Sequence, residues 1–343
     1  PEGFAPRRLF GLYVQDRLRA VEAAHPGRIT RLQGRVEAVE GTTAVLEDGR
    51  RIEGRAVVLA TGNPAPRTAS GTGARILSDP WEKGALDVIG AQDRVAIIGT
   101  GLTMVDMAVW LKARGWQGSL FALSRRGLGP RAHGDQPDAA LTVPRALTEG
   151  PASVRLGAAR RLIRDGQWRG LMEGLRPLTG DLWRAADRDT RARWVRHLRP
   201  FWDVHRHRIA PDIAADLEAL SDAGRLTVVA GRVVSITASA DAVSLTFRPK
   251  GKREAQTVEA DWLIDCTGPG HSPVRDPLTG PLIASGHARL DPLGLGLELD
   301  EAGRVLISDG TPDPALFVLG PPARATFWET VAVPDIRKRI EVL

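Results

Sequence analysis

Cysteine is almost absent from the sequence, because Cys266 is the only one in 343 residues. A single thiol excludes an intrachain disulfide and a Cys-x-x-Cys redox pair. It also excludes a zinc site built from several cysteines and a self-contained iron–sulfur cluster. The remaining His, Asp and Glu residues show no metal-ligand spacing, so the sequence predicts no metal site.

Long hydrophobic runs are missing too. No apolar run reaches the ~18–20 residues that a membrane-spanning helix needs, and no basic head with an apolar core opens the chain. We therefore expect a cytoplasmic protein that does not bind a membrane. A chain of 343 residues is long for one core and fits two domains.

Lysine is scarce, with 5 residues against 42 arginines, and the formal net charge is +6. The positive charge is concentrated in residues 155–208, which hold 14 arginines and 6 acidic residues. Such a field attracts anionic ligands. The same segment has helical Trp and Leu spacing and no zinc-finger or RNA-module signature, so nucleic acid is not an expected partner.

Strand and helix patterns alternate along the chain, which is typical of an α/β fold. Glu47-Asp48-Gly49 is a hairpin signal between two of the expected strands. A helical pattern over residues 145–222 interrupts this frame and predicts an insertion. Strands are expected at residues 35–39, 43–46, 51–60, 95–98, 119–124, 226–230, 233–237, 243–247, 258–265 and 316–319. Other helices are expected at residues 12–25, at 102–111 and from about 333, and residues 63–80 form a Pro/Gly/Ser-rich connection.

The strongest chemical motif is Gly99-Thr100-Gly101-Leu102-Thr103-Met104, directly after the apolar strand 95–98. The first glycine permits a tight turn, and the second lets a pyrophosphate approach the backbone at a helix N-terminus with free N–H groups. Met104 replaces the third glycine of the usual fingerprint. The context of strand, turn and helix predicts a dinucleotide site, although an ordinary turn between a strand and a helix would read similarly.

The next strand ends in Ser124-Arg125-Arg126, where an NAD site usually has an acidic residue for the ribose hydroxyl. Two guanidinium groups suit a 2′-phosphate, so Arg125 and Arg126 favour NADP. In an arginine-rich protein the pair could also be a solvated turn.

Two further strands end in Thr-Gly, at Thr61-Gly62 and at Thr267-Gly268. Such turns let the chain pass close to a cofactor with no side chain between them. The last expected strand ends at Gly320-Pro321 and is followed by Trp328 and a helix, which could direct N–H groups at an anionic ring. Simple chain termination is the alternative for this last segment.

Together these segments resemble the flavoproteins with two dinucleotide-binding domains, and in particular the bacterial FAD/NAD(P)-binding oxidoreductase family of the HcaD/YdhS type. The resemblance spans residues 6–337. It rests on the segments PRRLFGLYV, VVLATGNPAP, VAIIGTGLTMVD, LSRRGLGPRAH, RPFWDVHRHRIAP, DCTGPG and LGPPARATFWETVAVPDIR.

The resemblance implies two interleaved Rossmann-like domains in three layers with a helical insertion. Residues 1–80 and 271–343 would form the FAD domain, residues 81–144 and 223–270 the NAD(P) domain, and residues 145–222 the insertion. Gly99, Gly101 and Thr103 would hold the nicotinamide dinucleotide. The other implied cofactor-binding residues are Arg7, Val36, Thr61, Gly62, Arg125, Arg126, Thr267, Gly268, Gly320, Pro321 and Trp328. The family's N-terminal G-x-G-x-x-G unit is missing, and we expect that Pro1 follows it.

The implied function is an oxidoreductase that uses FAD and NADPH to pass a hydride to the flavin and then to an acceptor or oxygen. The Thr-Gly strand ends also resemble N-hydroxylating and other class B flavin monooxygenases acting on small-molecule substrates. His205 and His207 are the candidate acid–base residues, and at most one should face a site because residues i and i+2 point in different directions on a helix. The alternative is a non-catalytic NADP-binding sensor or interaction module with an arginine-rich docking surface.

Overall fold

The computed structural model describes residues 3–64, 73–134, 139–269 and 272–342, so residues 65–72 of the predicted connection 63–80 lie outside it. The described chain forms two compact units, residues 1–57 and 58–343. The finer division into FAD, NAD(P) and insertion segments stays a prediction.

The unit of residues 1–57 holds one helix, α1 (Arg7–Ala24), and a three-stranded antiparallel sheet. The strands are β1 (Val36–Glu40), β2 (Thr43–Leu46) and β3 (Arg51–Glu53). The predicted hairpin joins β2 to β3: Gly49 takes a φ of +82°, and the Asp48 carboxylate accepts a hydrogen bond from the Arg50 N–H. A positive φ is the reason for glycine at this turn.

The unit of residues 58–343 is built around a seven-stranded sheet in the order β10-β9-β8-β7-β6-β11-β5. Strands β5, β11, β6, β7 and β8 run parallel, and β9 and β10 add an antiparallel hairpin at one edge. The bounds are β5 (Ile76–Leu77), β6 (Val95–Ile98), β7 (Leu120–Ser124), β8 (Leu226–Ala238), β9 (Val243–Pro249), β10 (Gln256–Ala260) and β11 (Trp262–Asp265).

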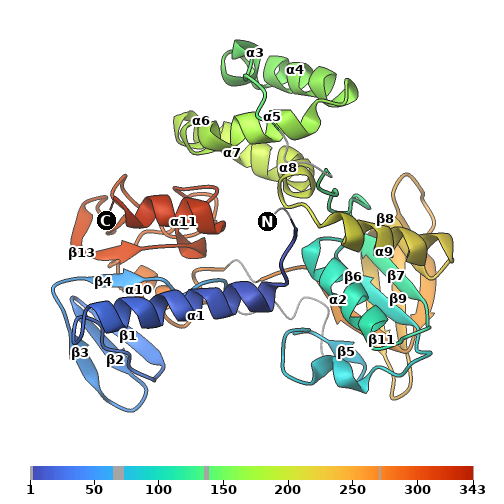
Figure 1. Ribbon diagram of the computed structural model, residues 1–343, viewed down its shortest axis with the longest axis horizontal. Helices are drawn as coiled ribbons and strands as arrows, with labels where there is room; N and C mark the ends of the chain where they lie inside the picture. The colour runs from blue at the N-terminus through green and yellow to red at the C-terminus, as the bar shows by residue number, and fades with distance from the viewer. Residues whose placement is uncertain (1–2, 65–72, 135–138, 270–271, 343) are drawn as a thin grey trace. The chain divides into compact units, whose positions relative to one another are not determined.

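Helices α2 (Leu102–Ala113) and α9 (Pro211–Asp222) cover one face of this sheet (Figure 1). Ile97 of β6 and Leu111 of α2 are at most 1% exposed in the core between them. Leu245, Phe247 and Leu263 build a second core from the strands, with side chains of Ala96 and Leu123. The central strands are therefore buried on both faces, as parallel strands require.

Two of the predicted strands are divided in the structure, and two others are joined. Residues 258–265 divide into β10 and β11 because Asp261 interrupts the strand, and its carboxylate accepts hydrogen bonds from the backbone and side chain of Arg94. Residues 51–60 likewise divide into β3 and β4 (Val57–Leu59). The segments 226–230 and 233–237 join in the single bulged strand β8.

A smaller sheet in the order β12-β13-β4 contains β12 (Arg304–Leu306) and β13 (Pro312–Val318). The Leu319 N–H donates to the Leu59 carbonyl at 2.9 Å, so the chain leaves β13 and β4 at the same end of this sheet. Two helices, α10 (Thr279–Ala284) and α11 (Val333–Ile340), belong to this part of the chain.

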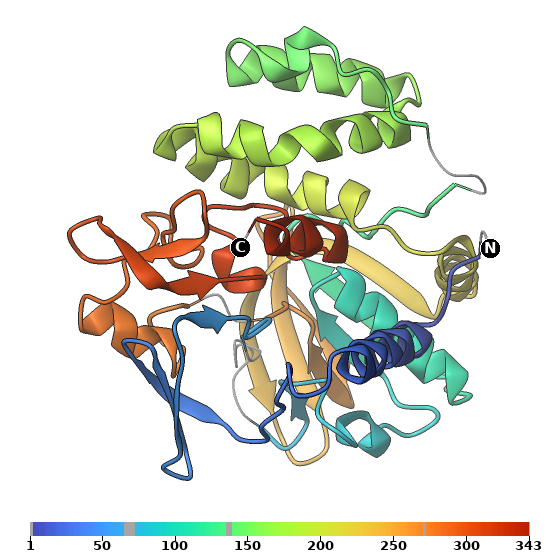
Figure 2. The same cartoon turned by 60° about the vertical axis from the view of Figure 1, so that its left-hand side comes forward.

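The predicted insertion, residues 145–222, ends in α9, which packs on the parallel sheet. The helices before α9 form a helical block, and Figure 2 shows them stacked on one another. They are α3 (Arg145–Thr148), α4 (Ala152–Arg164), α5 (Trp168–Leu175), α6 (Thr179–Ala185), α7 (Arg188–Arg193) and α8 (Arg199–Arg206). A π-helical turn, Trp194–Leu198, joins α7 to α8. Such short π turns are rare and are frequent at functional sites.

Candidate functional site

The predicted dinucleotide motif lies at the carboxyl end of the parallel sheet, where β6 passes through Gly99 and Gly101 into α2. Gly99 has a φ of +104°, and a Cβ there would come within 2.2 Å of the Cys266 carbonyl oxygen. Strand β11 is packed so closely at this point that the position accepts only glycine. This first glycine is therefore required by the fold itself.

Gly101 is different, because a Cβ added to it meets no atom within 4 Å. It is the N-cap of α2 and is exposed, and no side chain caps the helix. The first N–H groups of α2, including that of Thr103, are therefore available to an anion in the space beside Gly101. The free N–H donors and the open space beside Gly101 together fit a pyrophosphate group.

Met104 stands where the usual fingerprint has its third glycine, and its surroundings show why a larger side chain fits there. Its side chain is 2% exposed and packs in the core with Ile97 and Leu111. In this chain a methionine therefore fills the space between helix and sheet that the fingerprint usually leaves to glycine.

Thr100 is a site residue that the sequence did not indicate. Its hydroxyl donates to the Leu128 carbonyl at 2.6 Å and lies 2.8 Å from the Ser124 hydroxyl, whose oxygen also accepts from the Gly127 N–H. These bonds tie the glycine turn after β6 to the arginine turn after β7. The guanidinium groups and the helix N-terminus thus belong to one rigid edge.

The two arginines of this edge differ in their surroundings. Arg125 is exposed and, within the described ranges, forms no hydrogen bond or ion pair. The Arg126 guanidinium lies 4.9 Å from the centre of the Phe201 ring and donates to the Arg196 carbonyl at 3.3 Å. Arg125 is thus the better placed of the two to meet a 2′-phosphate, while Arg126 also connects this edge to α8.

Replacing Arg125 with alanine should therefore weaken NADPH binding about tenfold and leave NADH binding unchanged, since a charge-assisted contact of this type contributes about 1.5 kcal/mol. Calorimetric titration of both nucleotides measures the two effects. Arg114→Ala is the matched control, because Arg114 follows the opposite end of α2 and pairs with Asp87. Equal losses for NADPH and NADH would contradict the assignment.

Three more predicted cofactor turns have glycines with positive φ: Gly62 (+73°), Gly268 (+92°) and Gly320 (+75°). Within the part of the chain that the structure describes, an added Cβ meets no atom within 4 Å at any of the three. Thr61 and Thr267 precede two of them and are exposed. The backbone at each turn is thus open to a ligand, which is what a bound cofactor requires of strand ends.

Thr267 is also positioned by its own strand. Its N–H and hydroxyl both donate to the Asp265 carboxylate, at 2.9 and 2.6 Å. Cys266 between them is buried, and burial raises the pKa of its thiol far above the usual range. This cysteine is therefore an inert packing residue.

The segment after β13 contacts the helical block. Pro321 begins a 3-10 turn after Gly320, and Trp328 lies 4.5 Å from Trp183, ring centre to ring centre. The Trp183 indole N–H donates to the Ala325 carbonyl at 2.8 Å. Trp328, which follows the Gly320-Pro321 turn, is thus held against α6.

A buried charge cluster strengthens the same contact. Glu329 accepts from the Trp202 indole N–H at 2.8 Å, and its other oxygen lies 3.3 Å from Nε of Arg206. Arg324 lies over Trp328, and burial lowers its pKa to about 10. Sequence reasoning did not find this cluster, because its members come from α8 and from a segment more than one hundred residues later.

The two candidate histidines lie on different sides of α8. His205 contacts Trp168 edge to face, its Nδ1 lies 2.7 Å from the Phe201 carbonyl oxygen, and it lines a cavity in the helical block. His207 lies outside that lining and faces Asp203, Glu329, Arg206 and Arg324. Burial lowers its pKa, against the opposing effect of the two carboxylates.

This lowered pKa has a consequence for stability. His207 stays neutral in the folded chain at pH values where the unfolded chain binds a proton. With respect to this group, the free energy of unfolding is therefore highest above about pH 6.5 and decreases as the pH falls below that value. We expect His207→Asn to show a smaller fall between pH 7.5 and 5.5 in urea unfolding. An identical pH dependence in both proteins would contradict this interpretation.

Arg7 and Val36 belong to the unit of residues 1–57. Arg7 begins α1 and is exposed, and Val36 begins β1 with 39% exposure. Among the described residues, no helix is long and apolar enough to cross a membrane, and no group of three His, Cys, Asp or Glu side chains could hold a metal ion.

Comparisons with known proteins agree with this architecture. A family model described as FAD-NAD(P)-binding matches residues 1–64, and no curated protein matches the chain in sequence. Ornithine N-hydroxylase of Kutzneria sp. 744, in a structure with FADred, NADP+ and L-orn, is 17% identical over 99% of this chain and 76% of its own, with a TM-score of 0.61.

Two other solved structures are similar. The cadaverine monooxygenase DfoA of Erwinia amylovora, bound to FAD, is 13% identical over 98% of this chain and 75% of its own, with a TM-score of 0.59. L-lysine 6-monooxygenase of Pseudomonas syringae is 15% identical over 97% and 81%, with a TM-score of 0.57. The chain thus has the Rossmann-type α/β fold of flavin-dependent monooxygenases, and the predicted fold class is confirmed.

Proposed function

We propose that this chain is an FAD-dependent NADPH oxidoreductase, of the monooxygenase type and related to the HcaD/YdhS-like flavoproteins. The observation that carries the proposal is the edge formed by Gly99, Gly101 and Arg125. It combines free helix N–H groups, open space at one glycine and a free guanidinium. This combination suits a dinucleotide with a 2′-phosphate.

The roles of the residues follow from these surroundings. The N–H groups at Gly101 and Thr103 would hold the pyrophosphate, and Arg125, with Arg126 beside it, would bind the 2′-phosphate. The open turns at Thr61-Gly62, Thr267-Gly268 and Gly320-Pro321 would lie against the flavin and the nicotinamide. Arg7 and Val36 would bind the FAD at its adenine side, and Trp328 would support the Gly320 turn through Trp183.

When bound, FAD would accept a hydride from NADPH and later pass on two electrons. The protein's own part is to position both cofactors and to keep competing chemistry away. Cys266 takes no part in electron transfer, because its thiol is buried and has no second cysteine in the sequence. The electrons would therefore leave to oxygen or another external acceptor. In a monooxygenation one oxygen atom enters the substrate and the other leaves as water.

Oxygen consumption tests this proposal. The purified chain, supplied with FAD and NADPH, should consume oxygen at the rate at which NADPH is oxidised, and NADH should be a poorer donor. Heat-denatured protein with the same FAD is the control for free flavin. Tight NADPH binding without any oxidation would contradict the enzyme and would support the sensor or interaction module instead.

A further inference from the structure

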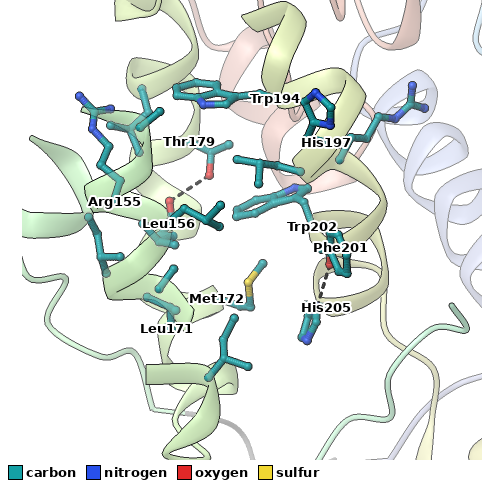
Figure 3. Close-up of a pocket in the computed structure, with 18 of the residues that line it drawn as sticks. Arg155, Leu156, Leu171, Met172, Thr179, Trp194, His197, Phe201, Trp202 and His205 are labelled. Carbon is teal, nitrogen blue, oxygen red and sulfur yellow. Dashed lines mark hydrogen bonds between the residues drawn. The ribbon is translucent and has the colours of Figure 1, made fainter. Parts of the chain in front are cut away.

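The helical block contains a cavity of about 790 Å³. This volume is typical of a pocket that encloses a small organic molecule. Figure 3 shows α4 and α5 on one side of the cavity and Phe201, Trp202 and His205 of α8 on the other. Trp194, His197 and Leu198 of the π-helical turn also line it.

One face of α4 forms a continuous wall of this cavity. Its lining residues follow the spacing i, i+3, i+4, i+7, i+8, i+11, which is a single helical face. They are Ala152, Arg155, Leu156, Ala159, Arg160 and Ile163. A helix normally buries such a face in a core, but Ile163 of α4 is 39% exposed and Phe201 of the opposite wall is 44% exposed. The wall is therefore open to a ligand.

The lining is apolar and aromatic, with Leu171, Met172, Trp183, Trp194, Trp202 and Trp328 among its residues. Its charged members, within the described residues, are Arg126, Arg155, Arg160 and Arg199, and the lining contains no Asp or Glu. An ammonium group would find no carboxylate on these walls. An anionic group would find arginines.

Two of the four arginines are already engaged. Arg199 pairs with Asp203 at 3.3 Å, and Arg126 stacks on Phe201. Arg155 donates only through Nε, to the Gly150 carbonyl, and Arg160 has no ion pair or hydrogen bond among the described residues. The guanidinium groups of Arg155 and Arg160 are therefore the ones that a ligand can use.

We propose that this cavity binds the substrate, and that the substrate is a bulky apolar or aromatic molecule with a carboxylate or similar anionic group held by Arg155 and Arg160. That the bound molecule is a substrate rests on the proposed function. That the cavity binds such a molecule rests on the cavity alone. Trp328 lines the cavity eight residues after Gly320, so the wall is continuous with the segment expected at the flavin. The assigned class is bulky and apolar, and it needs no ammonium group. It thus differs from the amino acids ornithine and lysine and from the diamine cadaverine, for which the similar enzymes are named.

The test measures binding of pyrenebutyrate, with pyrenebutylamine as the probe of opposite charge and the same ring. Both titrations use the full chain, and calorimetry is combined with quenching of the cavity tryptophans. We expect pyrenebutyrate to bind at least tenfold more tightly than the amine. Equal affinity, or tighter binding of the amine, would overturn the assigned charge.

Variants locate the site. Replacing Arg155 and Arg160 together with glutamine should weaken pyrenebutyrate binding at least tenfold, whereas Arg161→Gln with Arg164→Gln, on the same helix but outside the lining, should not. Ala159→Trp should fill the cavity and abolish binding, whereas Ala215→Trp, exposed on α9, should not. Circular dichroism confirms that each variant is folded. Loss of binding in the controls as well, or unchanged binding in Ala159→Trp, would overturn the site.

These outcomes are independent of the flavin chemistry. Pyrenebutyrate binding that follows the predicted pattern, in a chain that does not oxidise NADPH, leaves the cavity assigned and refutes the oxidoreductase. NADPH oxidation in a chain whose cavity variants bind pyrenebutyrate normally refutes the cavity as the site and leaves the oxidoreductase intact.

Discussion

Gly101→Ala is expected to reduce the affinity for NADPH by at least tenfold while the thermal midpoint stays unchanged. The Cβ would occupy the space that the pyrophosphate needs beside the N-terminus of α2, which costs about 1.4 kcal/mol or more of binding energy. The fold tolerates the change, because Gly101 has a φ of −86° and its Cβ meets no atom within 4 Å. Calorimetry and thermal unfolding measure the two effects separately.

The contrast with Gly99 makes this prediction specific. Gly99→Ala should lower stability as well as binding, since its positive φ and the 2.2 Å approach to the Cys266 carbonyl leave no room for a side chain. Gly157→Ala, in the middle of α4, serves as a neutral glycine control. Unchanged NADPH affinity in Gly101→Ala would mean that the dinucleotide binds elsewhere.

Glu329→Ala has the largest expected effect on stability. It removes the carboxylate beside Arg206, whose side chain is only 13% exposed, and the acceptor of the Trp202 indole. Removing one partner of a buried pair costs about 3–5 kcal/mol when the remaining charge has no other partner. Arg206 keeps Asp335 at 3.8 Å, so we expect a loss at the lower end, about 3 kcal/mol. Urea unfolding measures the change in the free energy of unfolding.

The conservative variant and a surface control complete this test. Glu329→Gln keeps an oxygen that can accept from Trp202, so it should destabilise the chain less than Glu329→Ala. Glu341→Ala, at an exposed position after α11, should change the free energy of unfolding by less than about 0.5 kcal/mol. A loss in Glu329→Ala as small as that of the control would show that the cluster does not hold α8 to the C-terminal segment.

The parts of the fold that sequence reasoning predicted correctly are governed by local signals. The buried strand Val95–Ile98, its glycine turn and the helix after it each have a pattern within a dozen residues. The hairpin at Gly49 also has a local sequence pattern, Glu47-Asp48-Gly49. The division of residues 258–265 into β10 and β11 depends instead on Asp261 bonding to Arg94, more than 160 residues away, and no local pattern reports such a partner.

The same distinction applies to the candidate site. Gly101 and Arg125 could be selected from the sequence because the geometry of a strand–helix–strand unit fixes the distance in sequence between the glycine motif and the end of the next strand. Three other features could not be predicted from the sequence, because each joins segments that only the tertiary structure brings together. They are the hydrogen bonds of the Thr100 hydroxyl, the Trp202–Glu329 contact and the cavity. Trp183, Trp194 and Trp202 belong to a segment with helical Trp and Leu spacing, and that spacing alone does not show that they line a cavity.

Arg126 links the two parts of the account. The sequence predicts it for the 2′-phosphate of NADPH, and the structure also has it in the cavity lining, stacked on Phe201. A nucleotide that draws Arg126 away from Phe201 would change the cavity wall. The proposed dinucleotide edge and the cavity therefore share Arg126.

The most direct measurement of the central claim is the visible absorption spectrum of the purified chain with FAD, recorded without oxygen before and after NADPH is added. We expect the flavin absorption to be retained through gel filtration and to be bleached by NADPH, more slowly in Gly101→Ala. A chain that retains no flavin, or whose flavin absorption does not change with NADPH, would contradict the account.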